Sequence, residues 1–112
     1  MFNISPTSIL NVVMIYEVTV FIDNDLEEKW RNYMKKHIAD VMATGCFSKV
    51  AWFEIDDSAS TRRGFVICYT YETEEDFKTY SQHYAKALQK EHTDLFQGHF
   101  SAARRLLKQL EI

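Results

Sequence analysis

His92 is the side chain best placed to act as an acid or a base, because the helical pattern puts it on or beside an inward-facing stripe. An imidazole in a pocket between helix and sheet can exchange a proton near neutral pH, so one interpretation is a general base or a ligand contact. The other is a hydrogen-bonded histidine at the edge of the core, which is common in folded domains. The structural interpretation is favoured, and a catalytic role predicts a deep cavity and a shifted pKa at His92.

A second candidate site lies on the first expected strand. Glu17 and Thr19 project from its mixed face, and this strand is expected to be central in the sheet. Arg104 or Arg105 on the last strand can reach Glu17 across one strand spacing. The groups would then form either a polar ligand site near a dimer seam or a cross-strand ion pair that fixes strand register. The ion-pair interpretation is favoured.

Tyr69 belongs to a cluster of aromatic side chains on the expected strands. The cluster can line a cavity for a flat apolar ligand, or it can pack in the core and at a dimer seam, which is the favoured interpretation. Its members are Trp52, Phe53, Phe65, Tyr69 and Tyr71.

Metal, phosphate and thiol chemistry have no supporting pattern. His37, His83 and His99 are not spaced three or four residues from another His or a Cys, as a zinc site would want. Cys46 follows a helix end and Cys68 lies in a strand, so neither is expected to be reactive. With 3 glycines there is no phosphate-cradling loop, and no catalytic signature motif occurs. We expect no metal and no cofactor.

The composition is that of a single globular domain of 112 residues with a net charge of −3. No stripe of Lys and Arg is present, which argues against nucleic-acid binding. No apolar run is long enough to span a bilayer, and the start does not resemble a signal peptide. A cytoplasmic location with reduced cysteines follows by default. Residues 1–13, which hold the single proline, predict an appended arm or an extra edge strand, and residues 14–112 the domain.

The pattern of apolar positions and turn residues predicts six elements. Asp25 and Glu28 are spaced as a capping box, and Thr73 is a typical N-cap followed by three acidic residues. A break is expected near Tyr84. The elements are a strand at 15–23, a helix from 24–25 to 44–45, strands at 47–55 and 63–72, a helix from 73 to 98 and a strand at 100–107.

This order is β-α-β-β-α-β, which predicts an α+β, ferredoxin-like domain. Two right-handed crossovers place both helices on one face of a four-stranded antiparallel sheet. The opposite face would expose apolar residues such as Ile15 and Phe21, and a homodimer through that face is the economical way to cover them.

Three segments carry a resemblance to a known family. These are MIYEVTVFIDND at 14–25, HIADVMATGCF at 37–47 and LQKEHTDLFQGHFSAARRLL at 88–107. Together they resemble an uncharacterised bacterial domain-of-unknown-function family within the dimeric α/β-barrel superfamily, over roughly residues 14–107. Members typically begin at the position of Met14. They often have Pro at the positions of Ala39 and Lys86 and His at that of Tyr84, so a role for that histidine does not transfer.

The resemblance implies the fold and a homodimer but no established activity. The wider superfamily includes cofactor-free monooxygenases, isomerases and haem enzymes, which is an analogy of fold alone. We therefore expect an uncharacterised dimeric domain with no identifiable activity. The alternatives are a small cofactor-free enzyme with His92 as base and an Arg holding an anion, or a regulatory module that binds a small molecule.

Overall fold

The computed structural model describes residues 12–57 and 60–112. The expected N-terminal arm at residues 1–13 falls almost wholly outside these ranges, so the division into arm and domain stays a prediction. No helix of the described chain is both long enough and apolar enough to cross a membrane.

The described residues form an α+β domain with a four-stranded antiparallel sheet, which confirms the predicted ferredoxin-like fold. The elements in order are β1 (Met14–Asp23), η1 (Asn24–Leu26), α2 (Glu27–Ala43), β2 (Lys49–Glu54), β3 (Arg62–Tyr71), α3 (Glu74–His83), α4 (Ala85–Phe96) and β4 (Phe100–Lys108).

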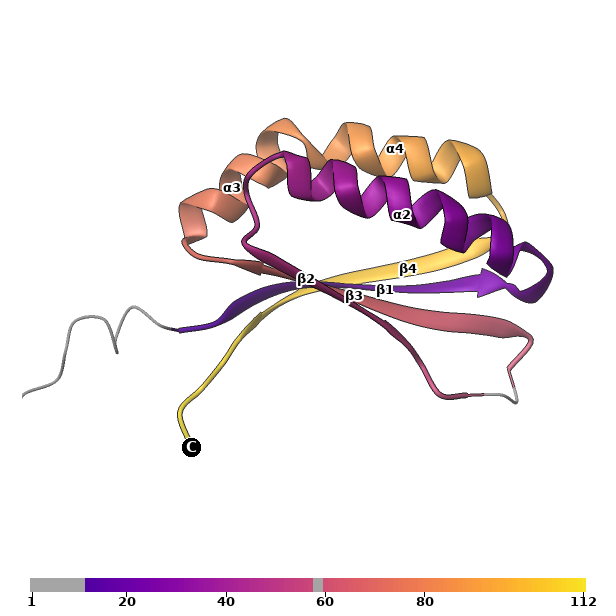
Figure 1. Ribbon diagram of the computed structural model, residues 1–112, viewed down its shortest axis with the longest axis horizontal. Coiled ribbons are helices and arrows are strands. Elements are labelled where there is room, and N and C mark those ends of the chain that lie inside the picture. Colours follow the sequence, from indigo (N-terminus) through magenta and orange to yellow (C-terminus); the bar gives the residue numbers. More distant parts are fainter. Residues whose placement is uncertain (1–11, 58–59) are drawn as a thin grey trace, which may run out of the picture.

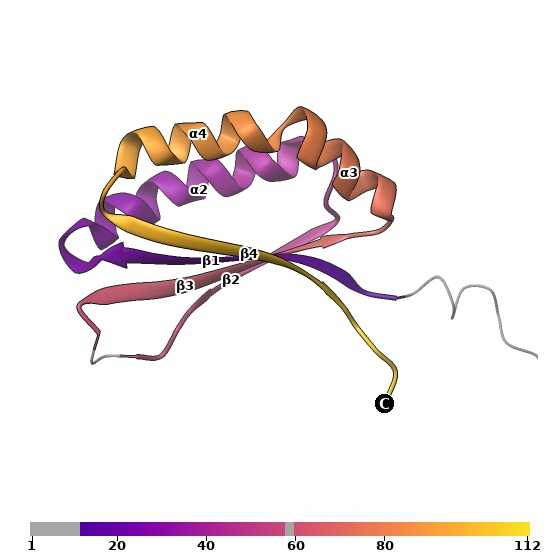
Figure 2. The same cartoon turned by 180° about the vertical axis from the view of Figure 1, so that it is seen from behind.

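The strand order is β2-β3-β1-β4, so β1 is central between the third and the last strand, as expected. Helices α2, α3 and α4 all lie over one face of this sheet (Figure 1). Seen from behind, the opposite face carries no described element (Figure 2). The domain thus has two layers, a helix-covered face of the sheet and an open face.

The core lies between the helices and the covered face and is dominated by aromatic rings. Tyr16, Val20 and Ile22 alternate along β1 and are buried, because successive strand residues point to opposite faces. Phe65 on β3 lies under Trp30 of α2, with ring centroids 4.8 Å apart. Burial of such large rings supplies most of the favourable free energy of a domain this small.

One of the predicted helix starts is wrong. Asp25 and Glu28 do not form a capping box, because the chain first makes the 3-10 turn η1 and α2 begins only at Glu27, with Leu26 at the N-cap and no side-chain cap. Thr73 does cap α3: its Oγ1 accepts a 3.0 Å hydrogen bond from the Asp76 amide. The predicted break is also confirmed, since Tyr84 separates α3 from α4.

The centre of the open face is mainly apolar, with the Glu17–Arg105 ion pair and a few small polar side chains. Lys49 and the Asp23–Arg62 ion pair lie nearer its edges. The Phe21 ring lies over Gly64 of the neighbouring strand, where an added Cβ would approach Phe21 Cε1 to 2.6 Å. Any larger residue at position 64 would push this ring off the sheet. By register and alternation, the residues of this face include Ile15, Glu17, Thr19, Phe21, Ala51, Phe53, Val66, Cys68, Ala103, Arg105 and Leu107.

Candidate functional site

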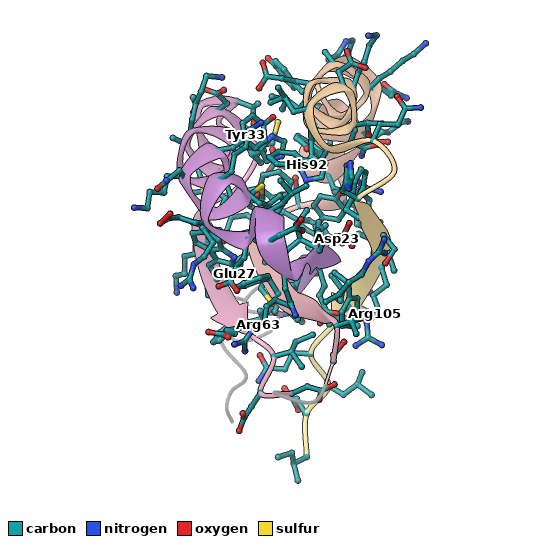
Figure 3. All side chains as sticks on the ribbon, turned by 90° about the vertical axis from the view of Figure 1, so that its right-hand side faces the viewer. Asp23, Glu27, Tyr33, Arg63, His92 and Arg105 are labelled. Carbon is teal, nitrogen blue, oxygen red and sulfur yellow. The ribbon has the colours of Figure 1, made fainter. Side chains whose placement is uncertain are left out.

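His92 is buried between α4 and the sheet, with only 6% of its surface exposed. Trp30 on α2 donates its indole N–H to Nε2 of His92 over 2.8 Å. The pKa of His92 is lowered to about 4, mainly by burial and to a smaller extent by the nearby His37 and Arg104. His92 is therefore neutral at pH 7, and its single basic lone pair is already taken by the Trp30 N–H. Figure 3 shows Tyr33 and His92 between α2 and α4, with Tyr33 farther from the sheet.

Beside His92, a polar chain crosses from α4 to α2. Tyr33 donates its hydroxyl to Oε1 of Glu91 over 2.9 Å, and the same hydroxyl lies 3.3 Å from Nδ1 of His37. Lys36 Nζ pairs with Asp40 at 2.8 Å and with Glu91 at 3.3 Å. Hydrogen bonds from Tyr33 and Lys36 lower the pKa of Glu91, so this carboxyl is ionised. Burial lowers the pKa of the His37 imidazole.

Arg104 on β4 points to the covered face, since it is opposite Val18 in the register. It borders an open pocket of about 230 Å³ between the α3–α4 junction and β4. Arg104 and Gln89 also line two inner recesses of about 30 Å³ each, one reaching Tyr69 and the other His92. We call the pocket and its two recesses the cleft. The outer pocket is lined by Tyr16, Phe77, Tyr80, Ser81, Ala85, Gln89, Arg104, Arg105 and Leu106.

Arg104 differs from the other arginines in its charge environment. Arg31, Arg62, Arg63 and Arg105 each pair with a carboxylate at 2.7–3.5 Å. No ion pair joins Arg104 to any carboxylate of residues 12–57 and 60–112. Burial raises the pKa of the Tyr16 hydroxyl in the same pocket, and the charge of Arg104 partly opposes this rise. The cleft therefore presents one uncompensated positive charge beside aromatic rings.

The four residues predicted to bind a ligand fall on two faces. Arg104 and Tyr69 lie on the covered face, whereas Glu17 and Thr19 lie on the open face. The arginine that reaches Glu17 is Arg105, with its Nε 2.7 Å from Oε1 of Glu17. The structure thus has the cross-strand ion pair on the open face and does not bring Arg104 to Glu17.

The aromatic cluster predicted with Tyr69 is also divided. Trp52, Phe65 and Tyr69 face the helices, and Tyr69 packs at a ring distance of 5.1 Å from Phe47. Phe53 is on the open face and 55% exposed. Nε1 of Trp52 is fully buried and has no hydrogen-bond partner in the described residues.

The sequence did not indicate that Gln89, Tyr16 and His37 line the cleft, or that Tyr33 contacts His37 and Glu91. One signal was available: Tyr33 and His37 are four residues apart on one helix, a spacing that brings side chains together. Metal-ligand spacing alone does not reveal this arrangement. Within the described chain, no group of three or more His, Cys, Asp or Glu is arranged to hold a metal ion.

A family model described as "Domain of unknown function (DUF4286)" matches residues 13–110, nearly the whole chain. The chain belongs to this family. No curated protein matches it in sequence. The family description assigns no activity, so no specific function is established for the domain.

Several solved structures share the fold of this DUF4286 domain. A conserved protein of unknown function from Bacteroides thetaiotaomicron, described as a possible oxidoreductase, is 17% identical with a TM-score of 0.65, covering 88% of this chain and 99% of its own. A variant of SnoaB, a cofactor-independent oxygenase from Streptomyces nogalater, is 8% identical with a TM-score of 0.64. The match covers 88% of this chain and 95% of the SnoaB chain. A dimeric ferredoxin-like protein from an uncultured marine organism is 15% identical with a TM-score of 0.63, covering 91% and 100%.

Proposed function

We propose that this domain is a homodimeric binding module whose cleft takes a small aromatic molecule with one anionic group. The observation that carries the proposal is Arg104, a guanidinium without a carboxylate partner in the described chain that borders an aromatic-lined pocket of about 230 Å³. Typical pockets for drug-sized ligands are about 300–1,000 Å³, so the ligand is expected to be small. A carboxylate would supply the charge that Arg104 lacks, with bidentate geometry available.

Benzoate is a suitable probe, because it is a small aromatic carboxylate. We expect Arg104→Gln to weaken benzoate binding by about tenfold or more, since a hydrogen-bonded charge contributes roughly 1.5–3 kcal/mol. Arg63→Gln is the matched control, because Arg63 lies outside the pocket and pairs with Glu54 and Glu27. Isothermal titration of the three proteins measures this. Equal affinities for all three, or no binding to the wild-type protein, would overturn the proposal.

The homodimer is proposed through the open face of the sheet. Its support is the row of apolar side chains that no described element covers, including Ile15, Phe21 and Val66, together with the dimeric state of a neighbour with this fold. Sedimentation equilibrium is expected to give twice the 13.2 kDa mass of the chain at micromolar concentration. A strict monomer would contradict the proposed interface.

We propose the cytoplasm of a bacterial cell as the location. Cys46 and Cys68 are both free thiols, as a reducing compartment favours. Fractionation of a bacterial host that expresses the tagged chain tests this, and accumulation in the periplasm would exclude it.

The enzyme alternative with His92 as general base has less support. Its Nε2 accepts the Trp30 N–H at 2.8 Å, and the recess beside it has about 30 Å³, room for about one water molecule. A base needs a free lone pair within reach of the proton that it removes. An enzymatic role would therefore need another group of the cleft.

A further inference from the structure

We infer that His37, and not His92, presents the hydrogen-bond-accepting nitrogen of the cleft, and that Glu91 fixes its tautomer through the Tyr33 hydroxyl. The ligand class that follows is a small hydroxyaromatic carboxylate, with its carboxylate on Arg104 and its hydroxyl on Nε2 of His37. This inference rests on the proposed ligand-binding function and adds the second polar contact of the same cleft.

Glu91 accepts hydrogen bonds from Tyr33 and Lys36. Its carboxyl is ionised and can only accept hydrogen bonds. The Tyr33 oxygen is 2.9 Å from Oε1 of Glu91, a distance at which two oxygens without a proton between them would repel. The single hydroxyl proton of Tyr33 is therefore directed at Glu91, and it is not free for a second acceptor.

The proton on His37 follows from this assignment. Nδ1 of His37 lies 3.3 Å from the Tyr33 oxygen, whose own proton is used. The contact is a hydrogen bond only when Nδ1 carries the proton and donates to Tyr33. A neutral imidazole has one protonated nitrogen, so the lone pair of His37 is on Nε2. Glu91 and Tyr33 are thus positioning residues, in the same sense as the carboxylate that orients a histidine in other sites.

Nε2 of His37 is available to a ligand. His37 lines both inner recesses, and no hydrogen bond to its Nε2 is made by the described residues. Among the described residues, Nε1 of Trp52 is the one side-chain nitrogen or oxygen that is both fully buried and without a hydrogen-bond partner. Since Nε2 of His37 has no partner either, it is not fully buried, and solvent reaches it. His92 is the opposite case, because its Nε2 accepts from Trp30 and its neutral ring can offer the cleft only a donor.

Burial lowers the pKa of His37 by more than the charges around it raise it, so His37 is neutral at pH 7. Burial lowers its pKa, and Lys36 and Arg104 act in the same direction, whereas Glu91 and Asp40 oppose them. The His92 ring is 6.1 Å away and is itself neutral. No other charged group among the described residues contributes to the pKa of His37. The lone pair on Nε2 is therefore present under physiological conditions.

The size of the recesses selects the ligand group. Each recess of about 30 Å³ holds about one water molecule, which is also the size of a hydroxyl. Gln89 and Arg104 line the outer pocket and both recesses, so a molecule bound on Arg104 is adjacent to His37. An aromatic carboxylate with a ring hydroxyl fits this arrangement. Its ring would lie in the outer pocket, its carboxylate would pair with Arg104, and its hydroxyl would donate to His37.

The tautomer can be measured without any ligand, from the ¹⁵N chemical shifts of the histidine rings in labelled protein at pH 7. We expect His37 to be the Nδ1–H tautomer, which is the less common one in solution. Tyr33→Phe should shift His37 toward the Nε2–H form, and Tyr84→Phe, a change at an exposed tyrosine outside the cleft, should not. A wild-type His37 with its proton on Nε2, or a tautomer unchanged in Tyr33→Phe, would overturn the inference.

The ligand class is tested with benzoate, 3-hydroxybenzoate and 4-hydroxybenzoate as probes. We expect one hydroxybenzoate to bind about five- to tenfold more tightly than benzoate, as one net hydrogen bond of roughly 1–1.5 kcal/mol implies. His37→Phe should remove this preference, so that the ratio of hydroxybenzoate affinity to benzoate affinity falls to about one. Benzoate binding without any hydroxyl preference would overturn the ligand class alone. Absence of benzoate binding would instead reject the proposed function, and the tautomer measurement would still decide the assignment of His37.

Discussion

The two faces of the sheet carry neighbouring arginines that are used differently. Arg105 points to the open face and is held by Glu17 at 2.7 Å. Arg104 points to the covered face, borders the pocket and has no carboxylate partner within the described chain. At the centre of the open face the Glu17 and Arg105 charges balance each other and the apolar groups are uncovered, which suits contact with a second copy. On the covered face most apolar groups are packed and the Arg104 charge beside the pocket is unbalanced, which suits a small anion.

The largest expected effect is a difference in stability loss between two matched Phe→Ala variants, one on each face of the sheet. Phe65 is 1% exposed under Trp30, so Phe65→Ala should lower the free energy of unfolding by about 3–5 kcal/mol. Phe53 is 55% exposed on the open face, and Phe53→Ala should change monomer stability by less than about 1 kcal/mol while weakening the dimer. Urea unfolding followed at several protein concentrations measures both. Similar losses in the two variants would contradict the difference between the faces.

The next effect is a loss of stability in acid that originates on the covered face. The pKa of His92 is about 4 in the folded chain, below the 6.5 of a free histidine. The unfolded chain therefore takes up this proton first, and the free energy of unfolding falls as the pH drops from 6.5 to 4. The loss is at most about 3.5 kcal/mol, at roughly 1.4 kcal/mol per pKa unit.

His92→Gln should flatten this pH profile, because glutamine can accept the Trp30 N–H without titrating. His83→Gln, at an exposed position on α3, is the control and should keep the wild-type profile. Urea unfolding across the same pH range distinguishes them. A wild-type slope retained in His92→Gln would show that another group dominates the acid response.

A smaller effect is expected from a charge placed on the open face. Thr19 lies on the central strand and is only partly exposed, so Thr19→Asp should leave the monomer folded. In the dimer each carboxylate would be buried without a partner, which should raise the dissociation constant by at least about tenfold. Thr93→Asp on the exposed side of α4 is the charge-matched control. Sedimentation velocity that shows equal dimer fractions would place the interface elsewhere.

The smallest effect concerns Arg105 itself. Its side chain is 69% exposed, and surface ion pairs contribute about 0–1 kcal/mol, so Arg105→Gln should change stability by no more than that. Benzoate affinity should fall less than in Arg104→Gln, because Arg105 also lines the outer pocket but its charge is paired with Glu17. A loss as large as that of Arg104→Gln would show that the two arginines share one role.

The sequence was sufficient for the elements and the topology, because alternation, N-cap and glycine signals are local. It could not decide whether Arg104 or Arg105 reaches Glu17, since a shift of register by one residue exchanges the two faces. The Trp30–His92 and Tyr33–Glu91 contacts join residues 62 and 58 positions apart, and only the packing of α2 on α4 brings them together. The failed cap at Asp25 has a similar cause: the 3-10 turn after β1 moves the start of α2.

We propose that the covered face, through Arg104, holds the ligand site. A titration of ¹⁵N-labelled protein with benzoate, followed by amide and arginine Nε resonances, tests it most directly. We expect saturable chemical-shift changes at the amides of Gln89 and Tyr80 and at Nε of Arg104. The amide resonances of Thr19 and Cys68 on the open face should not change. Shifts confined to the open face, or none at any residue up to saturating benzoate, would contradict it.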